Sequence, residues 1–360
     1  MPMVTIIGAG PAGCHVAELL AKKGYDVNLF EEHTEIGSPV HCTGLITSSI
    51  KDIVPVRKDT IINRISNVRI YSGKEVIDLK LKESNIVLDR KKFDSSLADK
   101  AIKSGAKIFL NYKFINHHQG ISTLVQNKKT VDIKSDILIG ADGPLSRVAK
   151  SSGLFGKRKF LTGIQAIAKR RNDNAIEFYP SIGAFAWVVP EDDSVCRIGI
   201  AAYNNTAGIF DQFLDKMGIK KKNISVLQGG LIPIYSTKQR IQKDEVYLLG
   251  DAAQQVKATT GGGIIQGLKA GRVLTDSIIK GRYYQKELDK EMKNDLYLHL
   301  KMRQVMDRFK EKDWEKLLHL VNKPKIRNIL EEFDRDYPTA FAAKLLLNEP
   351  RLLLFGKFLL

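Results

Sequence analysis

Three glycines and one glutamate near the N-terminus have the spacing of a dinucleotide-binding turn. Gly8, Gly10 and Gly13 follow one another in G-x-G-x-x-G order, and Glu31 comes 18 residues after the last of them. The first glycine of this pattern permits a tight turn, the second lets the backbone approach a pyrophosphate, and the third lets a helix pack closely on a strand. N–H groups at the helix start can hold the phosphates, and the carboxylate can accept hydrogen bonds from a ribose diol. The pattern predicts a dinucleotide site, and a glycine-rich turn of some other α/β protein is the simpler alternative.

The residues around these glycines predict the elements that would position them. An apolar run over 3–7 is typical of a buried parallel strand, and apolar residues then repeat with helical spacing over 16–20. A second apolar strand is expected over 27–30, directly before Glu31. Strand, helix and strand in this order favour the dinucleotide site over an unrelated turn.

A cysteine beside a glycine follows the second expected strand. His41, Cys42, Thr43 and Gly44 form the centre of a segment rich in turn formers. On composition alone, a small residue buried in a loop explains the cysteine as well as a functional role does. Arg90 precedes an amphipathic helix expected over about 93–104. A lone arginine there is usually solvated, but at the head of a helix in such a domain it can reach a pyrophosphate.

Two later turns each follow an apolar strand. They are GADG at 140–143 and GDAA at 250–253, and the second leads to three glycines at 261–263 that begin a helix with Ile264. Consecutive glycines at a helix start leave bare N–H groups, which suit an anion or a flat, electron-rich ring. A flexible linker is the alternative, but a linker would not lead straight into an apolar helix.

The middle of the chain is rich in short strands. Residues 60–88 and 160–233 predict an antiparallel sheet that covers the cofactor domain. Phe185 and Trp187 lie two positions apart in one of these strands and should share a face. An aromatic pair of this kind is more often part of a core than of a site.

Composition limits the partners and the compartment. Lys and Arg outnumber Asp and Glu by 57 to 40, and the net charge of +17 favours nucleic acid, an anionic membrane or an acidic partner. Nucleic acid is not expected, because the sequence has no basic tail and no nucleic-acid-binding motif. A generally lysine-rich proteome would also explain the charge. The three cysteines have no metal-ligand spacing and are too few for a disulfide framework. With no signal sequence or membrane span expected, the sequence predicts a cytoplasmic protein and no metal site.

Taken in order, four segments resemble the FAD-dependent reductase and hydroxylase superfamily typified by aromatic hydroxylases. They are GAGPAG with Glu31, Arg90, GADG at 140–143, and GDAA at 250–253 with GGGI at 261–264. Within that superfamily the chain looks most like the geranylgeranyl reductases, including the archaeal digeranylgeranylglycerophospholipid reductases. The features that carry this closer resemblance are the Cys42-Thr43-Gly44 loop, Phe185-Ala186-Trp187 followed by Gly199, and the GDAA…TTGGGI segment.

The resemblance implies FAD as the cofactor and indicates its contacts. The implied contacts are Ala12, Glu31, Cys42, Thr43, Gly44, Arg90, Phe114, Asp251, Gly263 and Ile264, with Phe114 carried only by its strand position after Gly105. The glycine turns add Gly8, Gly10, Gly13, Asp142, Gly261 and Gly262 to the candidates. The chain departs from the family pattern at Ala201, Gln254 and Ala258, which bears on the shape of the pocket rather than on FAD binding.

The implied activity is FAD-dependent hydrogenation of C=C bonds in geranylgeranyl chains, on a digeranylgeranylglycerophospholipid or on geranylgeranyl diphosphate. Cys42 and His41 are candidates for the proton donor or an orienting group, and Phe185 and Trp187 would wall an apolar pocket for the isoprenoid chain. NADPH or a ferredoxin would supply electrons, and the residues do not decide between them. The basic surface and the apolar tail would hold the protein peripherally on an anionic membrane, within reach of prenylated lipid.

Two other functions remain open on sequence grounds. A flavin-dependent monooxygenase or halogenase on the same scaffold is the first, because the halogenase strand motif W-x-W-x-I-P is close to the segment Phe185 to Pro190. Phe at the first position and the Cys42 loop favour the reductase. A non-catalytic flavoprotein or lipid-carrying module is the second.

The expected fold is α/β, or α+β overall. A Rossmann-type FAD-binding domain over 1–58, 89–155 and 241–283 is interleaved with an antiparallel β-sheet substrate domain over 59–88 and 156–240. A C-terminal helical region over 284–360 follows. Its charged part over 285–330 is expected to be a solvated appendage, and its apolar tail to pack on the core or to line a lipid-sized cavity.

Overall fold

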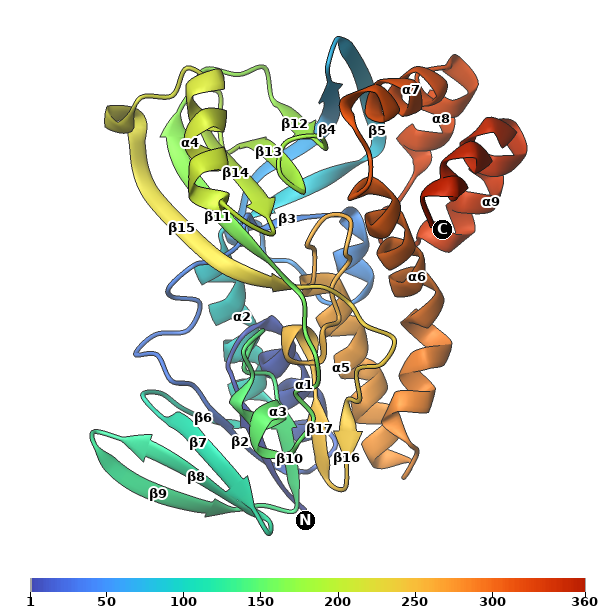
Figure 1. The fold of residues 1–360 in the computed structure, drawn as a ribbon. Coiled ribbons are helices and arrows are strands. Elements are labelled where there is room, and N and C mark those ends of the chain that lie inside the picture. Colours follow the sequence, from blue (N-terminus) through green and yellow to red (C-terminus); the bar gives the residue numbers. More distant parts are fainter. Residues whose placement is uncertain (1, 360) are drawn as a thin grey trace.

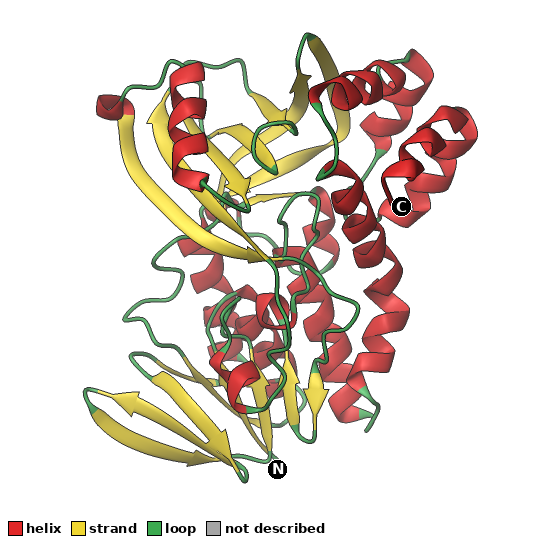
Figure 2. Ribbon diagram, in the orientation of Figure 1, coloured by secondary structure: helices red, strands yellow, loops and turns green. Residues whose placement is uncertain are grey.

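A computed structural model describes residues 2–359, and it has three sheets with helices packed around them (Figure 1, Figure 2). The first sheet has the order β16-β17-β10-β1-β2-β6, and its strands run parallel except for β16, which is antiparallel to β17. The strands are β1 (Met3–Ile7), β2 (Asp26–Phe30), β6 (Lys107–Phe109), β10 (Ile137–Gly140), β16 (Gln242–Lys243) and β17 (Val246–Leu248). The central strands are buried on both faces, which explains their nearly continuous apolar sequences.

The glycine turns lie together at the carboxyl edge of this sheet. In the parallel register Ile7 lies opposite Gly140, and Gly140 lies opposite Leu248, so the turns after β1, β10 and β17 are neighbours. This is the edge at which open parallel sheets bind ligands. The helices around the sheet are α1 (Pro11–Ala21), α2 (Arg90–Lys103), α3 (Arg147–Ser151) and α5 (Ile264–Ile279). The predicted Rossmann-type arrangement is therefore confirmed.

A larger sheet lies over that edge (Figure 1). Its order is β15-β11-β14-β13-β12-β4-β5-β3. The strands are β3 (Leu45–Ile46), β4 (Ile61–Ser72), β5 (Glu75–Leu88), β11 (Phe160–Lys169), β12 (Ala175–Tyr179), β13 (Phe185–Pro190), β14 (Val195–Ala202) and β15 (Ile224–Pro233). The predicted antiparallel sheet is confirmed except that β12 runs parallel to β4, because these two strands come from separate segments and not from a hairpin. Helix α4 (Thr206–Lys216) covers its outer face with Phe210, Phe213 and Leu214.

A small third sheet follows β6 along the chain. It has the order β7-β8-β9 and consists of β7 (Lys113–His118), β8 (Ile121–Gln126) and β9 (Lys129–Lys134). The sequence predicted only one strand after Gly105, so most of this sheet was not foreseen. The short 3₁₀ segments are η1 (Ser48–Asp52), η2 (Lys58–Thr60), η3 (Lys221–Asn223), η4 (Gly250–Ala253) and η5 (Pro350–Leu359).

The C-terminal helices pack against the cores of the two larger sheets. They are α6 (Tyr284–Met306), α7 (Glu311–Val321), α8 (Pro324–Glu332) and α9 (Pro338–Asn348). Leu288, Met292 and Leu296 of α6 belong to the main hydrophobic core, and Trp314 of α7 packs with Ile77 of β5. The expectation of a solvated appendage over 285–330 is therefore wrong, because one face of each of these helices is buried, and in α6 that face includes the charged Arg303. Within residues 2–359, the structure has no helix of the length and apolar character needed to cross a membrane.

Candidate functional site

The turn between β1 and α1 requires two of its three predicted glycines. Gly8 has a φ of +101°, and a Cβ there would lie 2.4 Å from the Ala141 carbonyl oxygen. A Cβ on Gly13 would lie 2.0 Å from the Gly8 carbonyl oxygen, so helix and strand meet backbone to backbone. Within the described residues no side chain caps α1, whose N-cap is Gly10. The first N–H groups of α1, near Ala12, therefore suit an anion.

Glu31 stands against this turn. Its carboxylate accepts hydrogen bonds from the backbone N–H of Ala9, at 2.8 Å, and from that of His33, at 3.1 Å. The His33 Nδ1 lies 2.5 Å from the same carboxylate. The contact with Ala9 fixes the carboxylate beside the phosphate-binding turn, which is where a ribose would follow a bound pyrophosphate. Its bond to a ribose stays a prediction.

The second group of candidate residues surrounds Arg90. This residue begins α2, three positions earlier than the sequence suggested, and its Nε and Nη2 donate to Asp94 at 3.0 and 2.8 Å. Burial lowers the pKa of Arg90, but the neighbouring Asp94 carboxylate, with a further contribution from Cys42, outweighs burial and raises the pKa. Burial raises the pKa of Asp251 to about 6, and Arg90 partly offsets that rise. The structure thus brings Arg90, Cys42 and Asp251 together from three separate segments.

The Cys42 loop is fixed by two residues of the larger sheet that the sequence did not single out. Buried Arg197 donates to the carbonyl oxygens of Thr43 and Leu88, and buried Gln165 accepts from the Thr43 hydroxyl at 2.7 Å. Cys42 is half-buried and its sulfur accepts from the Gly44 N–H at 3.3 Å, whereas His41 is exposed. A polar residue inside an apolar strand pattern is the signal that could have identified Gln165 and Arg197, because buried polar groups need partners.

Phe185 and Trp187 share one face of β13, as predicted. Their ring centroids are 5.7 Å apart, and Trp187 donates from Nε1 to Gln165 at 2.9 Å. A Cβ on Gly199 would lie 2.4 Å from the Trp187 ring. The indole can therefore pack on β14 only because this position is a glycine. Phe185 is buried and Trp187 is half-buried, which makes Trp187 the more accessible of the pair.

The glycine loop before α5 lies between Asp251 and this aromatic face. A Cβ on Gly263 would be 2.8 Å from Asp251 Oδ1, and a Cβ on Gly261 would be 3.5 Å from the Phe185 ring. Helix α5 begins at Ile264 and, in the part of the chain that the structure describes, has no side-chain cap. Bare helix N-termini at α1 and α5, with the glycine backbone between them, fit a dinucleotide with a flat ring.

Two predicted residues have local structural roles in addition, and their contacts with FAD stay predictions. Asp142 uses both oxygens at the start of α3, accepting from Ser146 Oγ at 2.6 Å and from the backbone N–H groups of Arg147 and Val148 at 2.7 and 3.1 Å. The Phe114 side chain is 3% exposed and lies in the main core. Any contact of Phe114 with FAD is therefore expected from its backbone, because the ring is already packed against other side chains.

Comparison with known proteins agrees with this geometry. Residues 2–169 match the family model described as FAD binding domain. A digeranylgeranylglycerophospholipid reductase of Methanosarcina acetivorans is 30% identical over 75% of this chain and 73% of its own length. Digeranylgeranylglycerophospholipid reductase 3 of Methanosphaera stadtmanae is 30% identical over 82% of this chain and 83% of its own length.

The chain belongs to the digeranylgeranylglycerophospholipid reductase family. FAD is its cofactor, as the sequence predicted. A geranylgeranyl bacteriochlorophyll reductase-like protein of Thermoplasma acidophilum has the same fold, with a TM-score of 0.83 at 22% identity over 100% of this chain and 99% of that protein. A flavin-dependent brominase also has the fold, with a TM-score of 0.72 at 16% identity over 97% of this chain and 99% of the brominase. Reductases and halogenases thus share the scaffold, and the sequence relatives favour the reductase.

Proposed function

We propose that this member of the digeranylgeranylglycerophospholipid reductase family hydrogenates C=C bonds in the geranylgeranyl chains of a membrane-lipid precursor. The observation that carries the proposal is the convergence of the Cys42 loop, the glycine loop at 261–263 and the Phe185–Trp187 face, from three separate segments. Their meeting point combines a polar edge with an apolar wall, which a prenyl chain beside a flavin requires.

The nucleotide part of FAD would be held by the β1–α1 turn. The first N–H groups of α1 would bind the pyrophosphate, and Glu31 would accept hydrogen bonds from the ribose. Arg90 lies beside Gly44 and interacts with Cys42 and Asp251, and its guanidinium would add a positive charge for the pyrophosphate. When bound and reduced, FAD supplies a hydride, that is, two electrons and one proton, to one carbon of the alkene.

Cys42 is the better candidate for delivery of the second proton. It is half-buried beside Arg90, whereas His41 is exposed and its Cβ lies 3.3 Å from the Cβ position of Gly230 on β15. The thiol would donate its proton to the alkene carbon that does not receive hydride, and solvent would restore it. Thr43, held by Gln165 and Arg197, fixes the backbone from which Cys42 points.

The apolar wall would position the isoprenoid chain. Phe185 belongs to a cluster with Leu161, Ile234 and Ala258, and Trp187 and Leu300 pack against that cluster. Burial of an alkene segment against these side chains excludes water, and an unactivated alkene needs such positioning because it accepts hydride poorly. Each large aromatic contributes on the order of a few kcal/mol through apolar burial.

Mass spectrometry of a lipid reaction tests the proposal. Yellow holoprotein reduced with dithionite, given digeranylgeranylglyceryl phosphate and, in parallel, geranylgeranyl diphosphate, should yield product masses that rise in steps of two hydrogens. Cys42→Ala should lower the rate by about 10²-fold or more if the thiol donates the proton, and His41→Ala should leave it nearly unchanged. Mass gains at an unaltered rate in Cys42→Ala would make the cysteine a wall residue, and no gain in the wild type would overturn the reductase.

The C-terminal segment offers a surface for an anionic membrane. Leu347 is 82% exposed and Leu353 64% exposed, and the exposed Arg351 and Lys357 are near Leu353 in the sequence. Apolar side chains flanked by cations bind interfaces that contain anionic lipid. Sedimentation with vesicles should therefore depend on anionic lipid and weaken in Leu347→Ser/Leu353→Ser. Binding that is equal for neutral vesicles, or unaffected by the substitutions, would contradict this placement.

The electron donor is NADPH or a ferredoxin. The net charge of +17 suits the acidic surface of a ferredoxin, which would be steered to the protein at low ionic strength. Flavin bleaching by each reduced donor under anaerobic conditions, measured at two salt concentrations, decides between them. Salt-sensitive bleaching by ferredoxin alone would identify it, and salt-insensitive bleaching by NADPH would identify the nicotinamide.

A further inference from the structure

A carboxylate from the C-terminal region lies inside the FAD-binding domain. Asp336 comes from the loop between α8 and α9, and its side chain is 0% exposed. It forms an ion pair with Lys257, whose side chain is 5% exposed. Isolated charges are rarely buried to this extent unless a partner and further hydrogen bonds satisfy them.

Two further hydrogen bonds of Asp336 reach two other segments of the site. Its Oδ1 accepts from Gln266 Nε2 of α5 at 2.9 Å, and its Oδ2 accepts from the Thr47 hydroxyl at 2.6 Å. Thr47 follows the Cys42 loop and β3 directly. One carboxylate thus ties together the segment after the cysteine loop, the first turn of α5, and Lys257.

Lys257 in turn forms the base of the glycine loop. Its backbone N–H donates to the Gly262 carbonyl at 3.0 Å, and its carbonyl accepts from the Gly261 N–H at 2.9 Å. Its side chain folds back over the loop, with Cε 2.9 Å from the Cβ position of Gly262. The place of the Lys257 side chain therefore sets the place of the glycine backbone that touches Asp251 and Phe185.

A histidine reinforces the same contact. His299 of α6 is 3% exposed, its Nδ1 lies 2.7 Å from the Thr259 hydroxyl, and its Nε2 lies 3.1 Å from the Arg335 carbonyl oxygen. Thr259 belongs to the glycine loop, and Arg335 precedes Asp336 in the chain. Two neighbouring residues of the C-terminal region are thus bound, directly or through His299, to the same loop.

We infer that Asp336 is a positioning residue for FAD: through Lys257 it holds the loop over 257–263 at the flavin ring, so the C-terminal region sets the ring's environment. The inference rests on the proposed place of the ring at this loop. Asp336 does not touch the reacting atoms in this scheme, and its removal acts through the loop. The nucleotide end of FAD, held at the β1–α1 turn, is not altered.

Flavin spectroscopy of matched holoprotein variants tests the inference. Asp336→Asn is compared with Glu177→Gln, which removes a carboxylate from a buried ion pair far along the chain from this loop. In Asp336→Asn we expect the visible absorption maxima of bound FAD to be displaced. The ratio of reduced to oxidised flavin at equilibrium with a reference dye should change. The dissociation constant for FAD should rise about tenfold. Glu177→Gln should overlay the wild type in all three measurements.

Thr47→Val is the second variant, because it removes one hydrogen bond to Asp336 without leaving Lys257 unpaired. It should displace the flavin spectrum in the same direction by a smaller amount, and it decides the question if Asp336→Asn yields no folded protein. If both variants fold and their flavin spectra and ratios of reduced to oxidised flavin match the wild type, the inference is overturned. If only Thr47→Val folds, a match in that variant is sufficient to overturn it.

The lipid assay separates this inference from the proposed function. If the wild type reduces lipid and neither substitution changes the flavin, only the positioning role is refuted. A spectral shift in a protein that reduces no lipid would refute the proposed function and support the positioning role.

Discussion

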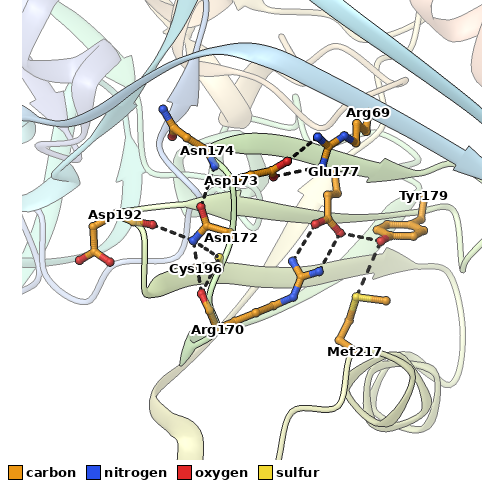
Figure 3. A network of polar contacts seen from close by, with 10 residues as sticks. All are labelled: Arg69, Arg170, Asn172, Asp173, Asn174, Glu177, Tyr179, Asp192, Cys196 and Met217. Atoms are coloured by element: carbon orange, nitrogen blue, oxygen red, sulfur yellow. Dashed lines mark hydrogen bonds and ion pairs between the residues drawn. The ribbon is translucent and has the colours of Figure 1, made fainter.

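Two buried ion-pair networks in this molecule use similar chemistry in different places. In the first, Arg170 donates to Glu177 at 2.8 and 3.3 Å, and the Tyr179 hydroxyl donates to the same carboxylate at 2.6 Å (Figure 3). These residues are close in the chain, since Arg170 directly follows β11 and the other two belong to β12. In the second, Lys257 and Asp336 are 79 positions apart and join the FAD-binding domain to the C-terminal region.

The difference lies in what each network holds. Side chains alternate along β12, so Glu177 and Tyr179 face away from Phe178, whose ring centroid lies 6.0 Å from that of Phe185 in the site. The Arg170 network therefore stabilises the outer face of the sheet, where α4 packs. The Lys257 network holds the glycine loop and has an effect on the site. Burial of an ion pair therefore does not by itself imply a role at the site.

The largest effect is expected from breaking the Lys257 network at one residue. Asp336→Leu leaves the Lys257 ammonium buried without its partner, and removal of one member of a buried pair costs about 3–5 kcal/mol of unfolding free energy. Urea denaturation of the holoprotein measures this cost. The double variant Lys257→Met/Asp336→Leu should recover more than half of the loss, because no charge then stays buried. A double variant as unstable as the single one would show that packing, and not charge, is what matters.

The second effect is a pH dependence of stability that arises from His299 in the Lys257 network. Burial, with a contribution from Lys257, lowers the pKa of His299 from 6.5 to about 4. The unfolded chain therefore binds more protons than the folded one between these values, and stability falls as the pH drops from 6.5 to 4. The contribution of His299 is at most about 3 kcal/mol.

Comparison of His299→Gln with the wild type isolates that slope. The amide can keep a hydrogen bond to Thr259 but does not titrate, so the variant should be less sensitive to pH over this range. Asp251 acts in the opposite sense, because its pKa is raised to about 6 and its stabilising effect is lost as the pH rises toward that value. The difference between variant and wild type cancels the Asp251 contribution, and identical slopes would contradict the prediction.

The smallest effect is expected from the Arg170 network. Glu177→Gln removes the charge but keeps the shape, and the Arg170 side chain is 24% exposed, so water can reach it. We expect a loss of about 1–3 kcal/mol of unfolding free energy, with the rate of lipid reduction unchanged. Thermal denaturation and the mass-spectrometric lipid assay check the two parts. A rate that falls together with stability would show that this network also reaches the site, and the contrast between the networks would fail.

The nucleotide half of the site could be predicted from the sequence because its causes are local. A Cβ on Gly13 would clash with the backbone of Gly8 in the same strand–turn–helix unit, and a Cβ on Gly8 would clash with the backbone of Ala141 in the adjacent turn. The apolar runs of β1, β2, β10 and β17 follow from burial on both faces of a parallel sheet. The shared face of Phe185 and Trp187 follows from the two-residue repeat of a strand.

The substrate half could be predicted only in part. The sequence marked Cys42 and Trp187, but it did not reveal that Gln165 binds Thr43 and Trp187 at once, or that Arg197 fastens the Cys42 loop. It predicted Phe114 and Asp142 as contacts of FAD, but it did not reveal that the ring of Phe114 lies in the core or that both Asp142 oxygens accept hydrogen bonds at the start of α3. Strand position alone does not say which of several neighbours a side chain will meet.

The sequence by itself therefore determined the dinucleotide turn, the Rossmann-type arrangement around it and the family. These depend on steric limits and side-chain periodicity over a few residues. Only the tertiary structure decided which of the many charged residues of 285–360 entered the interior, since Asp336 and a solvated aspartate look the same in the sequence. Burial of such a charge requires partners, here Lys257, Gln266 and Thr47, that lie 70 to 289 positions away and meet it only when all three regions have packed.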